Sequence, residues 1–254
     1  MKISTLSDIA ARVLPTVARE PMVLTAGSSR SAMRAMPAEL FGVRLRQSTE
    51  QTCGAMSLFM ATLEVLPGYR ESFRSLAANR SELAQAIAHS ESSMYQRARR
   101  SALGLFSWPA AFGTPPWGLA RELTKLWNAN HESAVQYRSI PVPSDPEVVR
   151  GVLMWAYHAN RHGLPVALYT GNDLESGVVN AVPRHVVLAM PQVAEAPSVT
   201  QGNSQAEPLL RIYDPASGFI YPLAIESLIE GTQAFAALGN WKRVVWALLP
   251  EPQR

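Results

Sequence analysis

The sequence predicts an α+β domain, and three observations support this prediction. Apolar residues recur at spacings of three and four in the first part of the chain, as in amphipathic helices. After Gly163 the pattern changes to short apolar runs, which are typical of strands. Hydrophobic residues make up 47% of the 254 residues and charged residues 17%, an ordinary globular composition. Helices that precede strands favour a helical lobe followed by an antiparallel sheet lobe.

The first forty residues differ in pattern from the rest. An amphipathic stretch over Ile9–Val17 is interrupted by Pro15, and a serine-rich run follows over Thr25–Ser31. We expect residues 1–40 to form an N-terminal extension. It is either an arm packed on the domain or an export signal of the kind carried by injected bacterial effectors. The compact domain is expected over residues 41–254.

Helices are expected in the first part of this domain. The spacing predicts them over Cys53–Leu66, from Asn79 onward, over Trp117–Trp127 and from Asp145 to Ala159. Asn79 followed three residues later by Glu82 resembles a capping box. Pro146 falls in a first helical turn, where its missing N–H costs no hydrogen bond.

Strands are expected in the second part. The apolar runs are Pro165–Tyr169, His185–Met190, Leu209–Tyr213, Phe219–Tyr221 and Trp241–Leu249, with Val43–Arg46 as an earlier short strand or extended segment. Asp214–Gly218 is a turn, and Pro191–Pro208 is predicted to be an exposed loop or flap.

Composition excludes several classes of function. The 23 basic and 20 acidic residues give a formal charge of +3, too small an excess for a nucleic-acid-binding surface. The apolar runs are far shorter than the roughly 18 residues of a membrane span, and the start does not resemble a secretory signal peptide. A single cysteine excludes an internal disulfide and a multi-cysteine metal site. We expect no cofactor and no bound metal, and the oligomeric state stays open.

Cys53 lies where the first long helix is expected to begin. Unpaired backbone donors and the dipole at a helix N-terminus stabilise a thiolate over a thiol, and the thiolate is the nucleophilic form. Cysteine is also among the most often buried residue types, so a packing role is the simpler interpretation of this residue alone.

A thiolate nucleophile needs a histidine that stabilises it and later protonates the leaving group. Of the five histidines, His89 and His158 fall inside helical patterns, and His131 and His162 lie near helix ends. His185 instead opens a predicted strand, where its ring can reach a cleft while the following residues stay packed. The alternative is a structural histidine.

Asp214 ends the predicted strand Leu209–Tyr213 and precedes Pro215. If this strand pairs antiparallel with the His185 strand, its end lies beside the start of the other. A carboxylate there can hold the imidazole in the required tautomer and orientation. The alternative is a turn-forming aspartate.

Gln47 precedes Cys53 by six positions. A side-chain amide there can donate to a developing oxyanion together with the backbone N–H of Cys53. Gln51 is the competing amide, but it lies too close in sequence to curl back over the helix start. Each residue has a simpler explanation alone, whereas their order, glutamine, cysteine, histidine and aspartate, predicts a catalytic arrangement.

These motifs resemble papain-fold cysteine peptidases of the double-glycine-leader type, which process bacteriocin precursors. The segments that carry the resemblance are Gln47-Ser48-x-x-x-x-Cys53-Gly54-x-x-x-Leu58-x-Met60, Gly113-Thr114-Pro115, Gly163-Leu164-Pro165-Val166, Arg184-His185-Val186-Val187-Leu188 and Ile212-Tyr213-Asp214-Pro215-Ala216-Ser217-Gly218. They span about residues 41–250. The resemblance implies a two-lobed papain-like fold with Cys53 as nucleophile, His185 as base, Asp214 as orienting carboxylate and Gln47 as oxyanion donor.

The sequence departs from that family at three points. The spacing from Cys53 to His185 is longer than expected, the Pro191–Pro208 loop lengthens the spacing from His185 to Asp214, and Thr52 stands where the family usually has an acidic residue. No transporter is attached, so leader processing coupled to export is not carried over with the resemblance.

We therefore expect a cysteine peptidase that acts on a protein or peptide substrate. It would be cytoplasmic, or delivered as a bacterial effector into a host or target cell without a signal peptide. Two alternatives stay open: a deamidase or acyltransferase that uses the same triad, and a non-catalytic binding module that kept the fold.

Overall fold

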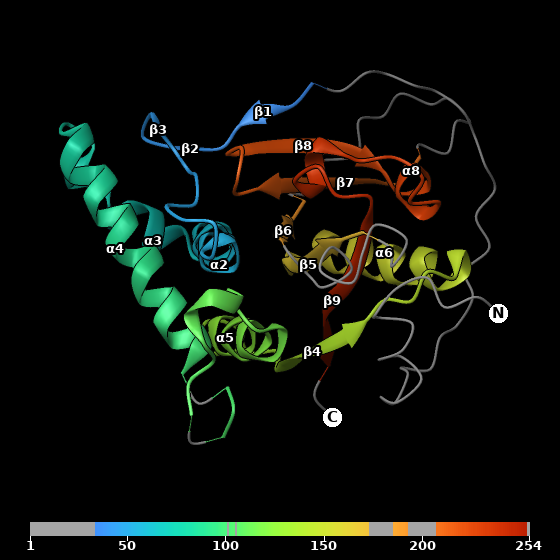
Figure 1. The fold of residues 1–254 in the computed structure, drawn as a ribbon. Coiled ribbons are helices and arrows are strands. Elements are labelled where there is room, and N and C mark those ends of the chain that lie inside the picture. The colour runs from blue at the N-terminus through green and yellow to red at the C-terminus, as the bar shows by residue number, and fades with distance from the viewer. Residues whose placement is uncertain (1–33, 101, 105, 173–184, 193–206, 253–254) are drawn as a thin grey trace.

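A computed structural model describes residues 34–100, 102–104, 106–172, 185–192 and 207–252 (Figure 1). Helices and an antiparallel sheet confirm the α+β class. The seven described strands of the sheet run in the order β1-β8-β7-β6-β5-β9-β4, and each neighbouring pair is antiparallel. The strands are β1 (Met36–Pro37), β4 (Val135–Pro141), β5 (Val166–Gly171), β6 (His185–Ala189), β7 (Leu209–Asp214), β8 (Phe219–Ala224) and β9 (Arg243–Pro252). A small hairpin of β2 (Glu39–Leu40) and β3 (Val43–Arg44) lies apart from this sheet.

A group of helices covers one face of the sheet. It comprises α2 (Cys53–Val65), α3 (Pro67–Glu71), α4 (Arg80–Arg99) and α5 (Pro116–Asn128), with short turns η1 (Arg74–Leu76) and η2 (Ala110–Phe112). The most central is α2, in which eleven of thirteen residues are buried. Its Ser57 hydroxyl donates to the Val186 carbonyl of β6 at 3.4 Å, so α2 lies directly against the strand that carries His185.

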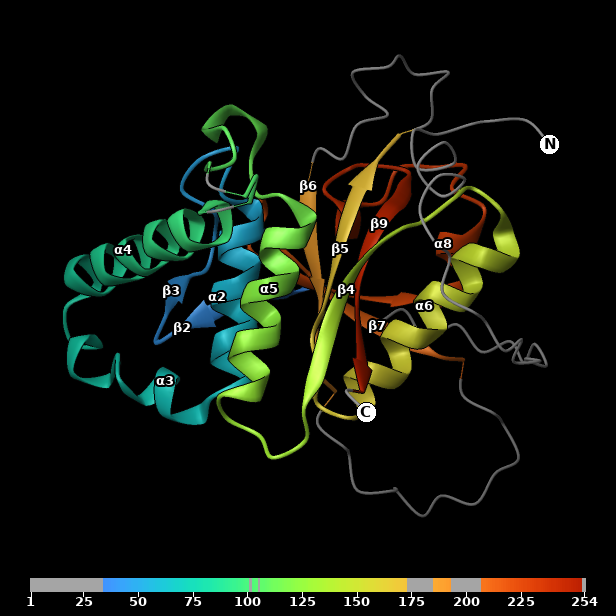
Figure 2. The same ribbon diagram turned by 90° about the horizontal axis from the view of Figure 1, so that it is seen from below.

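Two further helices cover the opposite face, as Figure 2 shows: α6 (Pro146–Arg161) and α8 (Ile225–Ile229). Alternation along the central strands explains the two layers. Val187 and Ala189 pack with α6, whereas Val186 and Leu188 pack with α2 and α5. Helices α2 to α5 precede strands β4 to β9 along the chain, but β1 precedes α2 and α6 falls between β4 and β5. The helix predicted from Asp145 belongs to the far face of the sheet.

Local signals explain where the helices begin. Asn79 caps α4, because its side chain accepts the N–H groups of Ser81 and Glu82 at 3.1 and 3.3 Å. Asp145 caps α6 in the same way, and Pro146 occupies the first turn as expected.

Strand β4 was not expected from the sequence. It pairs along its whole length with β9 and forms the edge of the sheet.

The predicted extension over residues 1–40 lies outside the described residues as far as residue 33, and residues 36–37 add β1 to β8. Most of the predicted Pro191–Pro208 loop also lies outside the described residues. No described helix has the length and apolar character that a membrane crossing requires.

Helices α4 and α5 cross at Gly118. A Cβ at this position would collide with the carbonyl oxygen of Ala98 and approach its carbonyl carbon to 3.1 Å. We expect Gly118→Ala to lower the free energy of unfolding by about 1–3 kcal/mol, because the helices must separate. Gly68→Ala is the matched control, since a Cβ there meets nothing within 4 Å. Urea unfolding checks this, and equal stability of the two variants would contradict the close crossing.

Candidate active site

Cys53 occupies the first position of α2, as the sequence predicts. The preceding Thr52 makes no side-chain cap, because its hydroxyl instead donates to the Thr49 carbonyl at 3.0 Å. The backbone N–H groups of the first turn of α2 therefore have no side-chain acceptor at the N-cap residue. Cys53 is 4% exposed and carries the one thiol of the chain.

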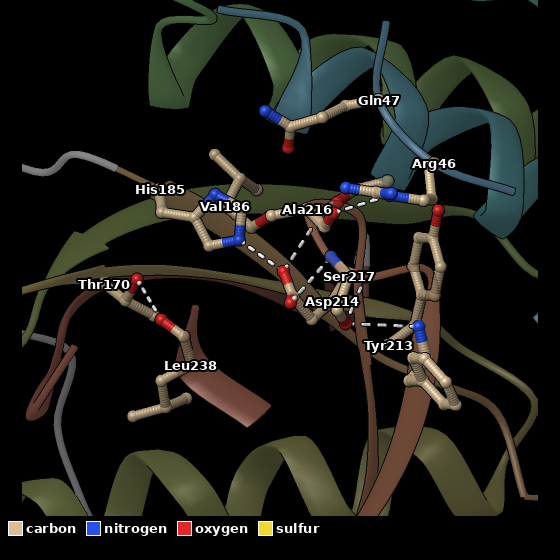
Figure 3. Close-up of polar contacts among 12 residues, drawn as sticks. Arg46, Gln47, Thr170, His185, Val186, Tyr213, Asp214, Ala216, Ser217 and Leu238 are labelled. Atoms are coloured by element: carbon tan, nitrogen blue, oxygen red, sulfur yellow. Dashed lines mark hydrogen bonds and ion pairs between the residues drawn. The ribbon is translucent and has the colours of Figure 1, made fainter. Parts of the chain in front are cut away.

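The structure brings His185 and Asp214 together. His185 opens β6 and Asp214 ends β7, and the antiparallel pairing of these strands sets one beside the other. The His185 Nε2 and Asp214 Oδ1 atoms lie 2.6 Å apart (Figure 3). His185 is 7% exposed and Asp214 2%, so this hydrogen bond is shielded from water.

Cys53 lies close enough to His185 to interact with its ring, because Cys53 contributes to the raised pKa of His185. Burial alone lowers the pKa of His185. Hydrogen bonds and charge interactions with Asp214 and Cys53 outweigh burial, and the pKa rises to about 9. With Nε2 taken by Asp214, Nδ1 is the ring nitrogen that remains for the thiol. The imidazole therefore interacts with an acidic side chain on one side and with the thiol-bearing side chain on the other.

Asp214 is held by its own turn as well as by His185. Its Oδ1 accepts the backbone N–H of Ala216 and its Oδ2 that of Ser217, both at 3.0 Å. Burial raises the pKa of Asp214, but the hydrogen bonds and the charge of His185 outweigh it, so the pKa lies below its ordinary value. The carboxylate is therefore ionised at neutral pH.

Three hydrogen bonds tie this turn to the segment that leads into α2. The Tyr213 hydroxyl donates to the Leu45 carbonyl, Gln47 N–H to the Pro215 carbonyl, and Arg46 Nε to the Ala216 carbonyl, each at 2.9 Å. We call these bonds the 45–47 strap. They place Gln47 beside the residues that follow Asp214.

Gln47 lies at the site, but its amide nitrogen faces away from it. Nε2 donates to the Thr49 carbonyl at 2.9 Å. Oε1 is buried and meets no hydrogen-bond donor among the described residues. Figure 3 shows this oxygen on the side of His185. To donate to an oxyanion, the amide must rotate so that Nε2 takes the place of Oε1.

Glycine after the cysteine allows a second segment to approach the start of α2. A Cβ at Gly54 would come within 2.7 Å of Thr114 Cβ, so only glycine admits Thr114 at this distance. The Thr114 carbonyl in turn accepts the buried Tyr169 hydroxyl at 2.8 Å. The Gly113-Thr114-Pro115 segment is thereby fixed against the start of α2.

Several supporting residues were not found from the sequence. They are Tyr213, Arg46, Thr114, Tyr169, Thr170 and Glu91, whose carboxylate accepts the Ser48 N–H at 3.0 Å. Their signals are weak, because each acts through one hydrogen bond to a residue distant in the chain. One clue is visible in the sequence: Glu91 falls on the apolar stripe of α4, in line with Leu83, Ile87 and Met94, and it is 1% exposed.

One pocket lies apart from this group. A pocket of about 450 Å³ lies between α2, α4 and α5, and it is lined by Leu58 and Thr62 of α2 rather than by Cys53. No cluster of three or more histidine, cysteine or carboxylate side chains among the described residues is arranged to hold a metal ion.

Comparison with protein-family models and with curated proteins finds no match to this sequence. The geometry of Cys53, His185, Asp214 and Gln47 is therefore the basis on which a function is assigned.

The raised pKa of His185 predicts a pH-dependent contribution to stability. The folded state holds the proton to about pH 9, whereas the unfolded chain releases it near 6.5. The contribution is complete below about pH 6.5 and is lost as the pH rises towards 9. We expect the stability advantage of the wild type over His185→Gln to shrink across this range. Urea unfolding at a series of pH values measures it.

The other four histidines are present in both proteins, so their titration cancels in this comparison. A stability difference that stays constant from pH 6 to about pH 9.5 would contradict the raised pKa.

Proposed function

We propose that this protein is a cysteine hydrolase with a papain-like fold, and that its substrate is a peptide. The observation that carries the proposal is the buried His185 imidazole, which hydrogen-bonds to Asp214 and whose pKa is raised by both Asp214 and Cys53. Helix α2 begins at Cys53 and lies on β6, which begins at His185. This arrangement supports the same assignment. The likeness of the motifs to double-glycine-leader peptidases favours peptide bonds over other acyl substrates.

In the proposed reaction, His185 holds a proton on Nδ1 at neutral pH and pairs with the Cys53 thiolate, and the sulfur attacks the substrate carbonyl carbon. The carbonyl π bond opens and leaves an oxyanion, which the Cys53 backbone N–H and the rotated Gln47 amide stabilise. The tetrahedral intermediate collapses, the C–N bond breaks, and His185 donates its proton to the leaving amine. Water then gives a proton to His185 and adds to the thioester carbonyl carbon, the C–S bond breaks, and the thiolate is restored beside the protonated His185.

Asp214 acts on the imidazole. Its charge favours the protonated ring that forms after proton transfer, and its hydrogen bond holds Nε2 so that Nδ1 faces the sulfur. No cofactor enters this chemistry, because all proton transfers use the chain's own side chains.

Substitutions at the site test the proposal. We expect Cys53→Ala to abolish cleavage of a peptide library and Asp214→Asn to retain a residual rate. Gln47→Ala should lower kcat by about 100-fold, the usual loss of one oxyanion donor. Gln51→Ala is the matched control, because it removes a nearby amide that the proposal does not use. Undiminished cleavage by Cys53→Ala would refute the assignment.

The reaction class is distinguished by the products. Mass spectrometry of a treated lysate should reveal new peptide termini, as proteolysis requires. A gain of about one dalton on intact proteins would instead identify a deamidase, which hydrolyses a side-chain amide by the same steps.

Alkylation separates an enzyme from a binding module that kept the fold. We expect iodoacetamide to label Cys53 rapidly at pH 6 in the native protein, because the neighbouring protonated imidazole stabilises the thiolate. His185→Gln should slow this labelling, while labelling after denaturation serves as the reference for both proteins. Slow labelling that depends on pH as a free thiol does would favour the binding module.

A further inference from the structure

A tight turn lies behind the His185 ring. It follows η4 (Ala236–Leu238) and is closed by a bridge between Phe235 and Trp241. Gly239 and Asn240 both adopt left-handed backbone conformations, each with φ of 66°. Glycine takes this conformation without strain and asparagine at a small cost, so the turn is a defined local structure.

This turn is anchored in the protein core. Ala237 and Leu238 are buried in the cluster beneath the far face of the sheet. The fully buried Thr170 hydroxyl donates to the Leu238 carbonyl at 3.0 Å. Thr170 of β5 is the direct cross-strand partner of His185, so the residue paired with the histidine also holds the turn.

Gly239 faces the edge of the imidazole that bonds to Asp214. A Cβ at Gly239 would lie 2.8 Å from Nε2 and 3.1 Å from Cγ of His185, and closer still to Cδ2. These separations are shorter than van der Waals contact. Only a residue without a side chain therefore lets the backbone approach the ring so closely.

We propose that Gly239, held by Thr170, is a positioning element for His185: it forms a backbone wall that keeps the imidazole against Asp214 and keeps water from Nε2. The inference rests on the proposed function for its catalytic meaning. Figure 3 shows the Thr170–Leu238 pair and Gln47 on opposite sides of His185. The turn therefore confines the His185 ring on the side opposite Gln47.

The wall matters because His185 changes charge twice in each turnover. An imidazole free to rotate can leave the line between the sulfur and the carboxylate, and a misplacement of about 1 Å can cost on the order of 100-fold in rate. A rigid backbone contact restricts rotation without adding a polar group that would compete for Nε2.

The test uses Gly239→Ala, with Gly104→Ala as its matched control. Gly104 has a similar left-handed φ of 68°, but a Cβ there meets nothing within 4 Å, so this variant carries the backbone strain alone. In protein with ¹⁵N-labelled histidine, we expect Gly239→Ala to shift or broaden the downfield Nε2–H signal of His185. It should also lower kcat/KM by about 100-fold, mainly through kcat. Gly104→Ala should leave both unchanged.

Thr170 supplies an independent pair of variants. Thr170→Val removes the hydroxyl donor, and we expect it to perturb the same signal, whereas Thr170→Ser keeps the donor and should restore it. If Gly239→Ala fails to fold by circular dichroism, the Thr170 pair decides. An unperturbed His185 signal in Thr170→Val, or in folded Gly239→Ala, would overturn the proposal.

The histidine signal also separates this inference from the proposed function. If the wild type cleaves no peptide but Gly239→Ala still shifts the His185 signal, the wall is supported and the hydrolase assignment fails. If the wild type cleaves peptide and Gly239→Ala behaves like Gly104→Ala in both measurements, the wall is refuted and the hydrolase assignment stands.

Discussion

The 45–47 strap is the constraint on which the site depends. Its bonds join residues about 170 positions apart in the chain, and one of them, from Gln47 N–H to the Pro215 carbonyl, uses only backbone groups that any sequence would offer. What selects the pairing is the fully buried Tyr213, whose hydroxyl finds its acceptor in the Leu45 carbonyl. Because the strap leads into α2 within a few residues, it sets the distance between the cysteine-bearing helix and the aspartate turn.

The parts of this arrangement that depend on local pattern could be predicted from the sequence. Helix α2 and the central strands β6 and β7 follow from periodicity, and their antiparallel pairing placed Asp214 beside His185 as expected. The cap at Asn79 followed from its spacing to Glu82. In each case neighbouring residues along the chain carry the whole signal.

The parts that depend on contacts between residues distant in the chain could not be predicted from the sequence. Apolar spacing predicts the helix Pro146–Arg161 but not which face of the sheet it covers, because its buried stripe fits either layer. The direction of the Gln47 amide is set by its hydrogen bond to the Thr49 carbonyl, and the types of these two residues do not predict that bond. Gly239 is one of fifteen glycines, and only its three-dimensional neighbour distinguishes it from the others.

Asp214 shows why the simpler and the catalytic interpretations of one residue need not compete. A turn-forming aspartate accepts nearby backbone N–H groups, and Ala216 and Ser217 supply these donors. The same bonds orient the carboxylate so that Oδ1 is presented to His185, and they offset the cost of burying its charge. A surface turn would leave the carboxylate hydrated and mobile. Here burial excludes water from the carboxylate, and the two N–H groups hold it in one orientation. A negative charge is thus fixed beside the imidazole, which is the condition for holding a histidine in one tautomer.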